Sequence, residues 1–523
     1  MRTIVLSGFM ATGKSTVGPL LAARLGIPFV DTDETIALEA RRSVPELWRA
    51  EGEAAFRARE ADVIARLLGE PTARVIAFGG GAVTNKTARR LALDNALVVT
   101  LTAEPEAIVA RVGDPSGRPN LAGPNPAQRA RDLLEQRADA YAECHLTLAT
   151  DATEPDAIVD AIVALADRDP IVVPLGARSY TIDVCFDAPT RLTDAIARCA
   201  PSSVVLVTDA NVQRARGAIV EAALGPLALP GTRVTLPAGE RHKTIAAVST
   251  IWDAALGAGV DRDALVVAVG GGVVGDLAGF AASALLRGVR VVQVPTTLLA
   301  MVDASVGGKT GFDHPTGKNL VGAFHQPSGV VADLAHLSTL SARERAAGLA
   351  EIVKIALTHD AALFAHLERD AAAIHAGHPA VLMPIVRAAI EAKVRVVRDD
   401  EREAGGRALL NLGHTIGHAL EAHGAFARYL HGEAVAIGTV VELRAAAALD
   451  LAPADLADRA SALLARLGLP IAAASGELAA SWSFVSADKK RSRDSVRLPV
   501  VTAIGTAHLE RVRLDALRRA VIG

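Results

Sequence analysis

The sequence is poor in cysteine and in aromatic residues. It has three cysteines in 523 residues, and no two of them form a Cys-x-x-Cys pair. This usage is typical of a reducing compartment, and it argues against a disulfide framework and against zinc held by thiolates. Only 3% of the residues are aromatic, so we expect a core built mainly from Ala, Val and Leu.

Long apolar runs and a strong net charge are also absent. No uncharged stretch approaches the roughly 18 residues of a membrane helix, and the N-terminus enters a short apolar segment without a cleavage region. With 55 basic and 58 acidic residues the net charge is −3, which gives no bulk attraction to nucleic acid or membranes. We therefore expect a cytoplasmic protein of two to four domains that acts on small molecules.

Lysine is scarce as well. Nine of the 55 basic residues are lysines, and all but Lys86 lie in segments that stand out for other reasons, with Lys489 and Lys490 adjacent. A chain that uses arginine for most of its solvated charge keeps lysine where a compact ammonium is needed, as beside phosphate or carboxylate oxygens. The alternative is chance clustering beside glycine-rich loops.

The N-terminal segment has the pattern of a phosphate-binding loop. An apolar strand leads into a loop that contains Gly8, Gly13, Lys14, Ser15 and Thr16, and an apolar helix follows. In this context Gly-x-x-x-x-Gly-Lys-Ser binds nucleotide phosphates, with Lys14 at the β and γ phosphates and Ser15 at Mg²⁺. The motif predicts phosphoryl transfer.

Polar residues suited to a second substrate follow this loop. Asp31 and Asp33 stand at alternate positions of the expected second strand, which would place both carboxylates on one side. A later strand runs into three glycines, residues 79–81, which let a small polar ligand approach the backbone. Three arginines, Arg57, Arg118 and Arg137, add positive charge.

Residues 1 to about 166 thus resemble shikimate kinase. The resemblance implies that shikimate is bound by Asp33, Arg57, Gly79, Gly80, Gly81 and Arg137, with Asp33 orienting or deprotonating the attacking hydroxyl. It places Asp31 and Ser15 at the Mg²⁺ of ATP, Arg118 on a lid over the phosphates and Arg111 beside the adenine. Each arginine alone is equally consistent with a surface charge, and gluconate and adenylate kinases share the phosphate-binding loop, so the interpretation depends on the set.

A domain boundary is expected near residue 169. An amphipathic helix ends at Arg168-Asp169-Pro170, and strands follow at once. Residues 265–269 then form an apolar strand that leads into Gly270-Gly271-Gly272-Val-Val-Gly275, a Gly-x-Gly-x-x-Gly pattern before a helix. This pattern indicates a dinucleotide site, but no acidic residue stands about 20 positions on to bind the ribose, so we expect a different NAD geometry.

A metal site is indicated further along. His414 and His418 are four residues apart and would share a helix face, and His431 follows. Glu351 with two of these histidines would make a three-ligand zinc site with one position open for substrate. Spacing alone favours His414 and His418, although such pairs are often packing or surface residues. A zincin motif is excluded because Thr415 follows His414.

Residues 170 to 523 together resemble 3-dehydroquinate synthase, a metal- and NAD-dependent cyclase. The resemblance implies that Zn²⁺ or Co²⁺ is bound by Glu351, His414 and His431, which revises the choice by spacing and leaves His418 as a catalytic group beside the metal. The residues implied for NAD are Asp209, Asn211, Glu240, Lys243, Gly271, Gly272, Asp276, Thr296, Thr297 and Thr339. Those implied for substrate are Arg287, Asp303, Lys309, Lys318, Asn319, Lys393, Arg407, Asn411 and Lys489, with Asp303, Lys354 and Glu403 also in catalysis.

The expected fold class is α/β. We expect a P-loop kinase domain with a parallel sheet at residues 1–168, an α/β NAD-binding part at 170–338 and an all-helical metal-binding part at 339–523. The synthase resemblance also implies a homodimer formed through the second half. Three alternatives stay open: a cyclase of aminocyclitol biosynthesis, a glycerol-type dehydrogenase, or one half serving as a non-catalytic scaffold.

Overall fold

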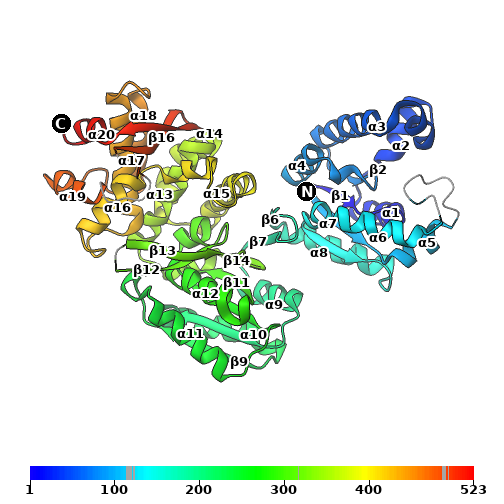
Figure 1. Cartoon of the computed structure of the whole chain (residues 1–523), viewed down its shortest axis with the longest axis horizontal. Helices are drawn as coiled ribbons and strands as arrows, with labels where there is room; N and C mark the ends of the chain where they lie inside the picture. Colours follow the sequence, from blue (N-terminus) through cyan, green and yellow to red (C-terminus); the bar gives the residue numbers. More distant parts are fainter. Residues whose placement is uncertain (114–120, 122–123, 316, 486–490, 493) are drawn as a thin grey trace. The chain divides into compact units, whose positions relative to one another are not determined.

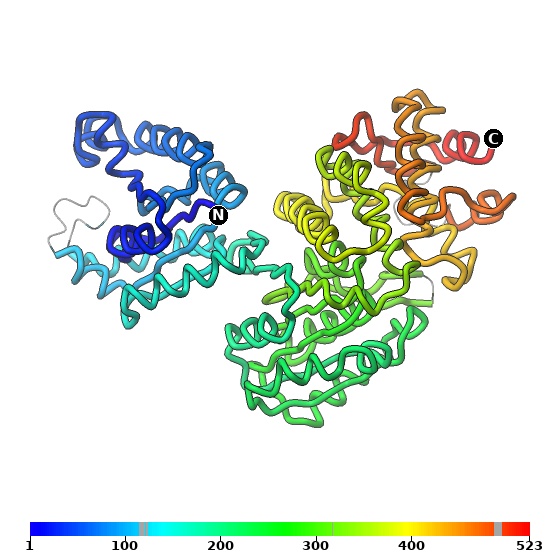
Figure 2. Tube along the Cα trace, turned by 180° about the vertical axis from the view of Figure 1, so that it is seen from behind, coloured from blue at the N-terminus to red at the C-terminus, as the bar shows by residue number. Residues whose placement is uncertain are grey.

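The computed structural model describes residues 1–113, 121, 124–315, 317–485, 491–492 and 494–523. The chain divides into two compact units, Met1–Thr181 and Ile182–Gly523, whose backbones Figures 1 and 2 show from opposite sides. We describe each unit by itself. Two predicted site residues, Arg118 and Lys489, lie outside the described residues.

A parallel sheet forms the centre of the N-terminal unit. Its five strands follow the order β2-β3-β1-β4-β5, and β1 pairs in parallel with both β3 and β4. The strands are β1 (Thr3–Ser7), β2 (Phe29–Asp31), β3 (Val75–Ala77), β4 (Ala96–Thr102) and β5 (Leu146–Ala149). The helices are α1 (Lys14–Leu25), α2 (Thr32–Ala40), α3 (Val44–Gly69), α4 (Lys86–Asn95), α5 (Pro105–Val112), α6 (Pro126–Gln136), α7 (Ala138–Ala142) and α8 (Pro155–Arg168).

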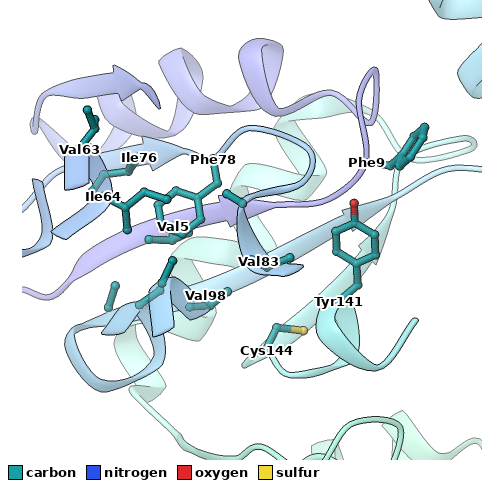
Figure 3. Close-up of a cluster of buried hydrophobic side chains, with 14 of the residues drawn as sticks. Val5, Phe9, Val63, Ile64, Ile76, Phe78, Val83, Val98, Tyr141 and Cys144 are labelled. Carbon is teal, nitrogen blue, oxygen red and sulfur yellow. The ribbon is translucent and has the colours of Figure 1, made fainter. Parts of the chain in front are cut away.

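Both faces of this sheet are covered. Ile4, Val5 and Leu6 of β1 are all fully buried, as expected for a central parallel strand. Val5 packs with Ile76 of β3 in the cluster drawn in Figure 3, whereas Ile4 and Leu6 belong to a second cluster. The alternation along β1 therefore gives each face of the sheet its own core.

The expected placement of Asp31 and Asp33 on one strand is wrong. Strand β2 ends at Asp31, and Asp33 lies in the first turn of α2. An Asp side chain is a favoured helix N-cap, and here Asp31 Oδ1 accepts a hydrogen bond of 2.9 Å from the backbone N–H of Asp33. The two carboxylates therefore reach the site from a helix cap and from the helix that it begins.

A second parallel sheet organises the first part of the C-terminal unit, where β7, β14, β11, β10, β8 and β9 are hydrogen-bonded in that order. The strands from the boundary onward are β6 (Ile171–Val173), β7 (Tyr180–Cys185), β8 (Val204–Asp209), β9 (Gly231–Leu236), β10 (Leu265–Gly270), β11 (Arg290–Pro295) and β14 (Gly329–Asp333). The helices of this part are α9 (Ala188–Cys199), α10 (Ala210–Leu224), α11 (Ile245–Gly257) and α12 (Gly272–Ala284). An antiparallel ribbon is formed by β12 (Lys309–His314) and β13 (Gly317–Phe324).

The rest of this unit is mainly helical, as Figure 1 shows in yellow to red. Its helices are α13 (Ala342–His359), α14 (Ala361–Ala376), α15 (Pro379–Asp399), α16 (His414–His423), α17 (His431–Ala448), α18 (Asp455–Arg466), α19 (Glu477–Val485) and α20 (Leu514–Ile522). The sequence did not reveal its small antiparallel sheet of β15 (Arg491–Ser492), β16 (Ser495–Ala503) and β17 (Thr506–Arg513). Within the described part of the chain, no helix is both long enough and apolar enough to span a bilayer.

Helix α13 lies in the interior of this helical part. Every residue from Ala346 to Thr358 is buried, which is the behaviour of a helix covered on all sides. A Cβ added at Gly432, in the first turn of α17, would overlap the backbone carbonyl of Ala347 in α13. The two helices therefore pack closely at this point, and this packing brings Glu351 of α13 near the start of α17.

Candidate active sites

The phosphate-binding loop joins β1 to α1. Gly8 has φ +131°, and a Cβ there would overlap the carbonyl oxygen of Leu101, so the turn requires glycine. The Lys14 ammonium donates hydrogen bonds to the carbonyls of Gly8, at 2.8 Å, and Phe9, at 2.7 Å. The N-terminus of α1 and this ammonium together form a site that suits nucleotide phosphates.

Two further residues predicted for ATP and Mg²⁺ lie at this loop. The Ser15 hydroxyl donates to Asp31 Oδ2 at 3.4 Å, so the two predicted Mg²⁺ residues lie together. Arg111 donates to the carbonyl of Ala11 in the loop at 3.2 Å and to Thr150. The structure thus brings the predicted nucleotide-binding residues to one place.

A cluster of opposite charges adjoins the loop. Arg57 Nη1 and Glu60 Oε2 are 2.6 Å apart, and Arg137 donates to the carbonyl of Gly80 at 3.3 Å. A Cβ added at Gly79 would lie 2.6 Å from Asp33 Oδ1 and 2.5 Å from Glu60 Oε1. Asp33, Arg57, Gly79, Gly80 and Arg137 therefore lie together in a single cluster.

Glu60 also belongs to this cluster, although the sequence pattern Arg57-x-x-Glu60 had not indicated a role for it. Glu60 is 1% exposed, and its Oε1 atom has no hydrogen-bond partner. Burial raises the pKa of the Glu60 carboxyl above its ordinary range, against the opposing charge of Arg57. The signal in the sequence was the three-residue spacing from Arg57, which puts both side chains on one helix face.

The predicted NAD residues gather at one edge of the second sheet. Strands β8, β10 and β11 are neighbours and parallel, and their carboxyl ends lead directly to Asp209, Gly271 and Thr296. In open α/β sheets the crevice outside the carboxyl ends of the strands is where ligands bind. Gly275 permits close packing of α12 on β11, because a Cβ there would lie 2.6 Å from Gln293 Oε1.

A network of ion pairs runs from this edge to the β12–β13 ribbon. The Lys243 ammonium donates to Asp276 Oδ2 and to Asn319 Oδ1, each at 2.6 Å. Lys318, next to Asn319 on β13, is 3.1 Å from Glu240 Oε1. Burial disfavours the Lys243 ammonium, but Asp276 and Glu240 outweigh burial and raise the pKa of Lys243. Residues from three separate segments thus form one charged cluster.

The candidate metal centre joins three helices. Glu351 comes from α13, and His414 and His431 are the first residues of α16 and α17. One ligand atom from each lies within 4.8 Å of the others. Glu351 Oε1 is 3.7 Å from His414 Nε2 and 3.3 Å from His431 Nε2. A second group within the same limit consists of His418, Glu421 and His431.

The donor set fits a divalent metal. The Glu351 side chain is 2% exposed, and its two oxygens make no hydrogen bond of normal geometry although the Lys354 ammonium contacts one of them. Lys354 supplies a positive charge at Oε2, and Oε1, which faces His414 Nε2 and His431 Nε2, is the buried oxygen that a metal ion would satisfy. One carboxylate oxygen and two imidazole nitrogens are ligands that zinc and cobalt accept.

Cationic and polar side chains surround this centre. The Lys393 ammonium donates to the Asp303 carbonyl at 2.5 Å and contacts the Asp303 carboxylate. Lys309 pairs with Glu403, which also accepts a 2.8 Å hydrogen bond from the Asn411 amide. Burial lowers the pKa of Lys393 to about 8. For Asp303, burial opposes ionisation, but Lys393 and Lys354 outweigh it and hold its pKa well below the usual range.

Of the remaining predicted residues, Arg407 and Thr339 donate hydrogen bonds to nearby backbone carbonyls. Arg407 donates to the carbonyls of Gly307, at 3.2 Å, and Glu401, at 2.5 Å. Among the described residues, no hydrogen bond or ion pair joins Arg287 or Thr339 to another predicted site residue. The structure therefore does not draw these last two into the clusters above.

Comparison with known families assigns the two compact units of the chain to different families. Residues 10–167 match the family model for shikimate kinase. Residues 233–347 match the model for the N-terminal part of 3-dehydroquinate synthase, and residues 348–491 match the model for its C-terminal part.

Individual relatives are similar to the second half of the chain. The 3-dehydroquinate synthase of Acidithiobacillus ferrooxidans is 43% identical over 341 residues, which are 64% of this chain and 93% of that protein. The synthase of Gloeobacter violaceus is 43% identical over 359 residues, which are 68% of this chain and 98% of that protein.

Solved structures of related cyclases share the fold. The 2-epi-5-epi-valiolone synthase ValA from Streptomyces hygroscopicus, solved with NAD⁺ and Zn²⁺, is 30% identical with a TM-score of 0.59 and covers 66% of this chain and 96% of its own. A 2-deoxy-scyllo-inosose synthase solved with carbaglucose-6-phosphate, NAD⁺ and Co²⁺ is 26% identical with a TM-score of 0.62 and covers 67% of this chain and 99% of its own. From these matches and the two sites, the chain belongs to the 3-dehydroquinate synthase family, carries a shikimate kinase domain before it, and is a bifunctional enzyme of the shikimate pathway.

Proposed function

We propose that the N-terminal site phosphorylates shikimate with ATP, and that the C-terminal site converts 3-deoxy-D-arabino-heptulosonate 7-phosphate to 3-dehydroquinate and phosphate. The observation that carries the second assignment is the buried Glu351 carboxylate facing His414 and His431. We also propose the domain limits 1–168, 170–338 and 339–523.

In the kinase site, positioning and charge neutralisation do most of the work. Lys14 leaves the loop carbonyls to hold the transferred phosphoryl group, while Ser15 and Asp31 hold Mg²⁺. Arg57 and Arg137 bind the shikimate carboxylate, and the Asp33 carboxylate accepts the proton of the attacking hydroxyl. Support for this arrangement is the single cluster that Asp33, Arg57 and Arg137 form with Gly79 to Gly81.

In the synthase site, Glu351, His414 and His431 would hold Zn²⁺ or Co²⁺, with NAD at the carboxyl ends of β8, β10 and β11. Bound there, the metal would supply polarisation of a substrate hydroxyl, and NAD a reversible hydride acceptor. The chain's own cations bind the substrate: Lys309, Lys318 and Asn319 suit the phosphate, and Lys393 and Arg407 suit the carboxylate and hydroxyls. Lys354, Asp303 and His418 orient the reacting hydroxyls beside the metal ligands.

The main alternative for the C-terminal unit is the reaction of a different sugar-phosphate cyclase. The solved neighbours ValA and 2-deoxy-scyllo-inosose synthase share the fold. Identity favours the dehydroquinate assignment, because the two synthases named above are 43% identical to this chain. The attached shikimate kinase domain favours the same pathway.

The proposal also includes an oligomeric state and a location in the cell. We infer a homodimer formed through the C-terminal unit and a cytoplasmic location, from the family resemblance and from the three free cysteines, which suit a reducing compartment. Sedimentation of the purified chain tests the dimer, because a monomer at micromolar concentration would contradict it.

The synthase assignment is tested by phosphate release with a trace of NAD. We expect release to exceed the NAD supplied, to stop after chelation and to return with Zn²⁺, because NAD is regenerated in each turnover. The absence of release from metal-replete protein would reject the assignment and favour another cyclase.

Gly81→Ala is expected to weaken shikimate binding. An added Cβ would overlap the guanidinium of Arg57 and displace it from its place beside Glu60. Losing one charge-assisted hydrogen bond costs roughly 1.5–3 kcal/mol, so KM for shikimate should rise about 10- to 100-fold while KM for ATP stays the same. Gly69→Ala is the matched control, since a Cβ at Gly69 meets nothing within 4 Å. An unchanged KM for shikimate would remove Arg57 from the proposal.

Synthase activity is expected to fall above pH 8. Lys393 has a pKa of about 8, and only its ammonium form binds an anionic substrate. Below this pKa the charge is present, and kcat/KM should fall tenfold per pH unit above it. Arginine stays charged at these pH values, so Lys393→Arg should lose this basic limb while keeping measurable activity. The same limb in both proteins would assign it to another group.

A further inference from the structure

The imidazole of His431 lies between two buried carboxylates. Its Nε2 is 3.3 Å from Glu351 Oε1, and its Nδ1 is 3.2 Å from Glu421 Oε2. The Glu351 and Glu421 side chains are each 2% exposed. One nitrogen of His431 therefore faces the other proposed ligands, and the opposite nitrogen faces a carboxylate that the proposed function leaves without a role.

The two oxygens of Glu421 have different partners. Oε2 faces His431, whereas Oε1 accepts a hydrogen bond of 3.1 Å from the Lys318 ammonium. Lys318 also lies 3.1 Å from Glu240 Oε1 and 4.6 Å from the centre of the Phe426 ring. Glu421 is thus held in place by a cation from β13, a segment about 100 residues earlier in the chain.

Two ligand arrangements that share His431 are compatible with the distances. One uses Glu351 and His414, and the other uses His418 and Glu421. Each carboxylate has one oxygen in contact with a lysine ammonium, Lys354 at Glu351 Oε2 and Lys318 at Glu421 Oε1. The other oxygens differ, because Glu351 Oε1 faces the Nε2 atoms of both His414 and His431, whereas Glu421 Oε2 lies against Nδ1 of His431. Glu421 therefore suits the role of a hydrogen-bond acceptor better than the role of a metal ligand.

We propose that Glu421 is a positioning residue for the metal ligand His431, and that Lys318 holds Glu421 in place. This inference rests on the proposed metal centre. A neutral histidine that binds metal through Nε2 carries its proton on Nδ1, and a carboxylate that accepts this proton fixes the tautomer and the ring orientation. The expected consequence is a higher affinity of the site for metal.

The test is the dissociation constant for Zn²⁺, measured on the full-length chain by competition with a chromophoric chelator. Loss of such a partner typically weakens metal binding about 10- to 100-fold, which is the change that we expect for Glu421→Ala. Glutamine has one oxygen and cannot accept from both Lys318 and His431, so Glu421→Gln is combined with Lys318→Met. In that background Glu421→Gln should bind Zn²⁺ more tightly than Glu421→Ala, because its amide oxygen can accept the Nδ1 proton. Wild-type affinity in Glu421→Ala, or equal affinity of the Gln and Ala variants in the Lys318→Met background, would overturn the positioning role.

Lys318 is tested by combining substitutions. Lys318→Met should weaken Zn²⁺ binding, and the double variant Lys318→Met/Glu421→Ala should bind no more weakly than Glu421→Ala alone, because Lys318 acts through Glu421. A double variant that binds Zn²⁺ more weakly than Glu421→Ala alone would show that Lys318 does not act through Glu421. Glu433→Gln is the control, since Glu433 lies in the first turn of α17 but pairs with Arg343, 2.6 Å away.

The same titration separates this inference from the proposed function. A wild-type chain that binds no Zn²⁺ would reject the metal centre itself. A wild-type chain that binds Zn²⁺ with an affinity unaffected by Glu421→Ala would reject only the role of Glu421.

Discussion

Glu351→Gln is expected to abolish the synthase activity while shikimate kinase activity stays at its wild-type level. The substitution keeps the size of the side chain but removes the charge that faces His414 and His431. A metal contributes several kcal/mol of transition-state stabilisation, so kcat/KM should fall on the order of 10³-fold or more. Phosphate release and bound Zn²⁺ per chain are the two measurements.

This prediction has an internal control in the other half of the chain. The kinase residues belong to Met1–Thr181 and Glu351 to Ile182–Gly523. Because Glu351→Gln leaves the Lys354 ammonium buried without its carboxylate, thermal unfolding and NAD binding must show that the C-terminal unit is still folded. A folded variant that keeps its metal and its activity would contradict the assignment of Glu351.

Asp33→Asn is expected to impair the shikimate kinase activity while the synthase activity stays at its wild-type level. A positioned general base contributes about 10²- to 10⁴-fold to a rate, so the kcat for shikimate phosphorylation should fall by that factor. KM for ATP should change little, because Asp33 lies beside Gly79 and Glu60 in the cluster that we propose binds shikimate. The measurement is shikimate-dependent release of ADP.

Synthase activity serves as the control for this variant, since it should stay at the wild-type level. If kcat falls less than twofold, Asp33 does not take the proton, and the buried carboxylate of Glu60 becomes the candidate. A loss of both activities would instead show that the two units depend on each other.

The parts of the fold that follow from local chemistry could be predicted. The strand–loop–helix at Lys14 and the glycine-rich turn between β10 and α12 both occur where the sequence placed them. In both cases neighbouring residues determine the structure, because glycines allow the turn and an apolar strand precedes it. The α/β class and the helical C-terminal part are confirmed by the structure and its relatives.

The metal site was harder to derive, because its ligands are brought together by packing. Spacing on one helix favoured His414 and His418, yet the group with Glu351 uses His431, the first residue of a different helix. Only the close approach of α13, α16 and α17 joins them. Family resemblance, rather than periodicity, identified His431.

Glu421 was missed although the sequence held a signal for it. It stands three residues after His418 and seven after His414, so all three share one face of α16. The position was overlooked because its partner Lys318 is about 100 residues away in the chain. The sheet of β16 and β17 was missed although these strands have nine and eight residues, because the whole segment after residue 339 was assigned to helices from its Ala-rich composition.

A single ³¹P NMR time course tests the central claim, that one chain carries both reactions. The purified, Zn²⁺-loaded chain would receive 3-deoxy-D-arabino-heptulosonate 7-phosphate, shikimate, ATP with Mg²⁺ and a trace of NAD. The account predicts inorganic phosphate far in excess of the NAD supplied, together with ADP and shikimate 3-phosphate. Inorganic phosphate that does not exceed the NAD supplied would contradict the claim for the synthase. The absence of ADP and shikimate 3-phosphate would contradict it for the kinase.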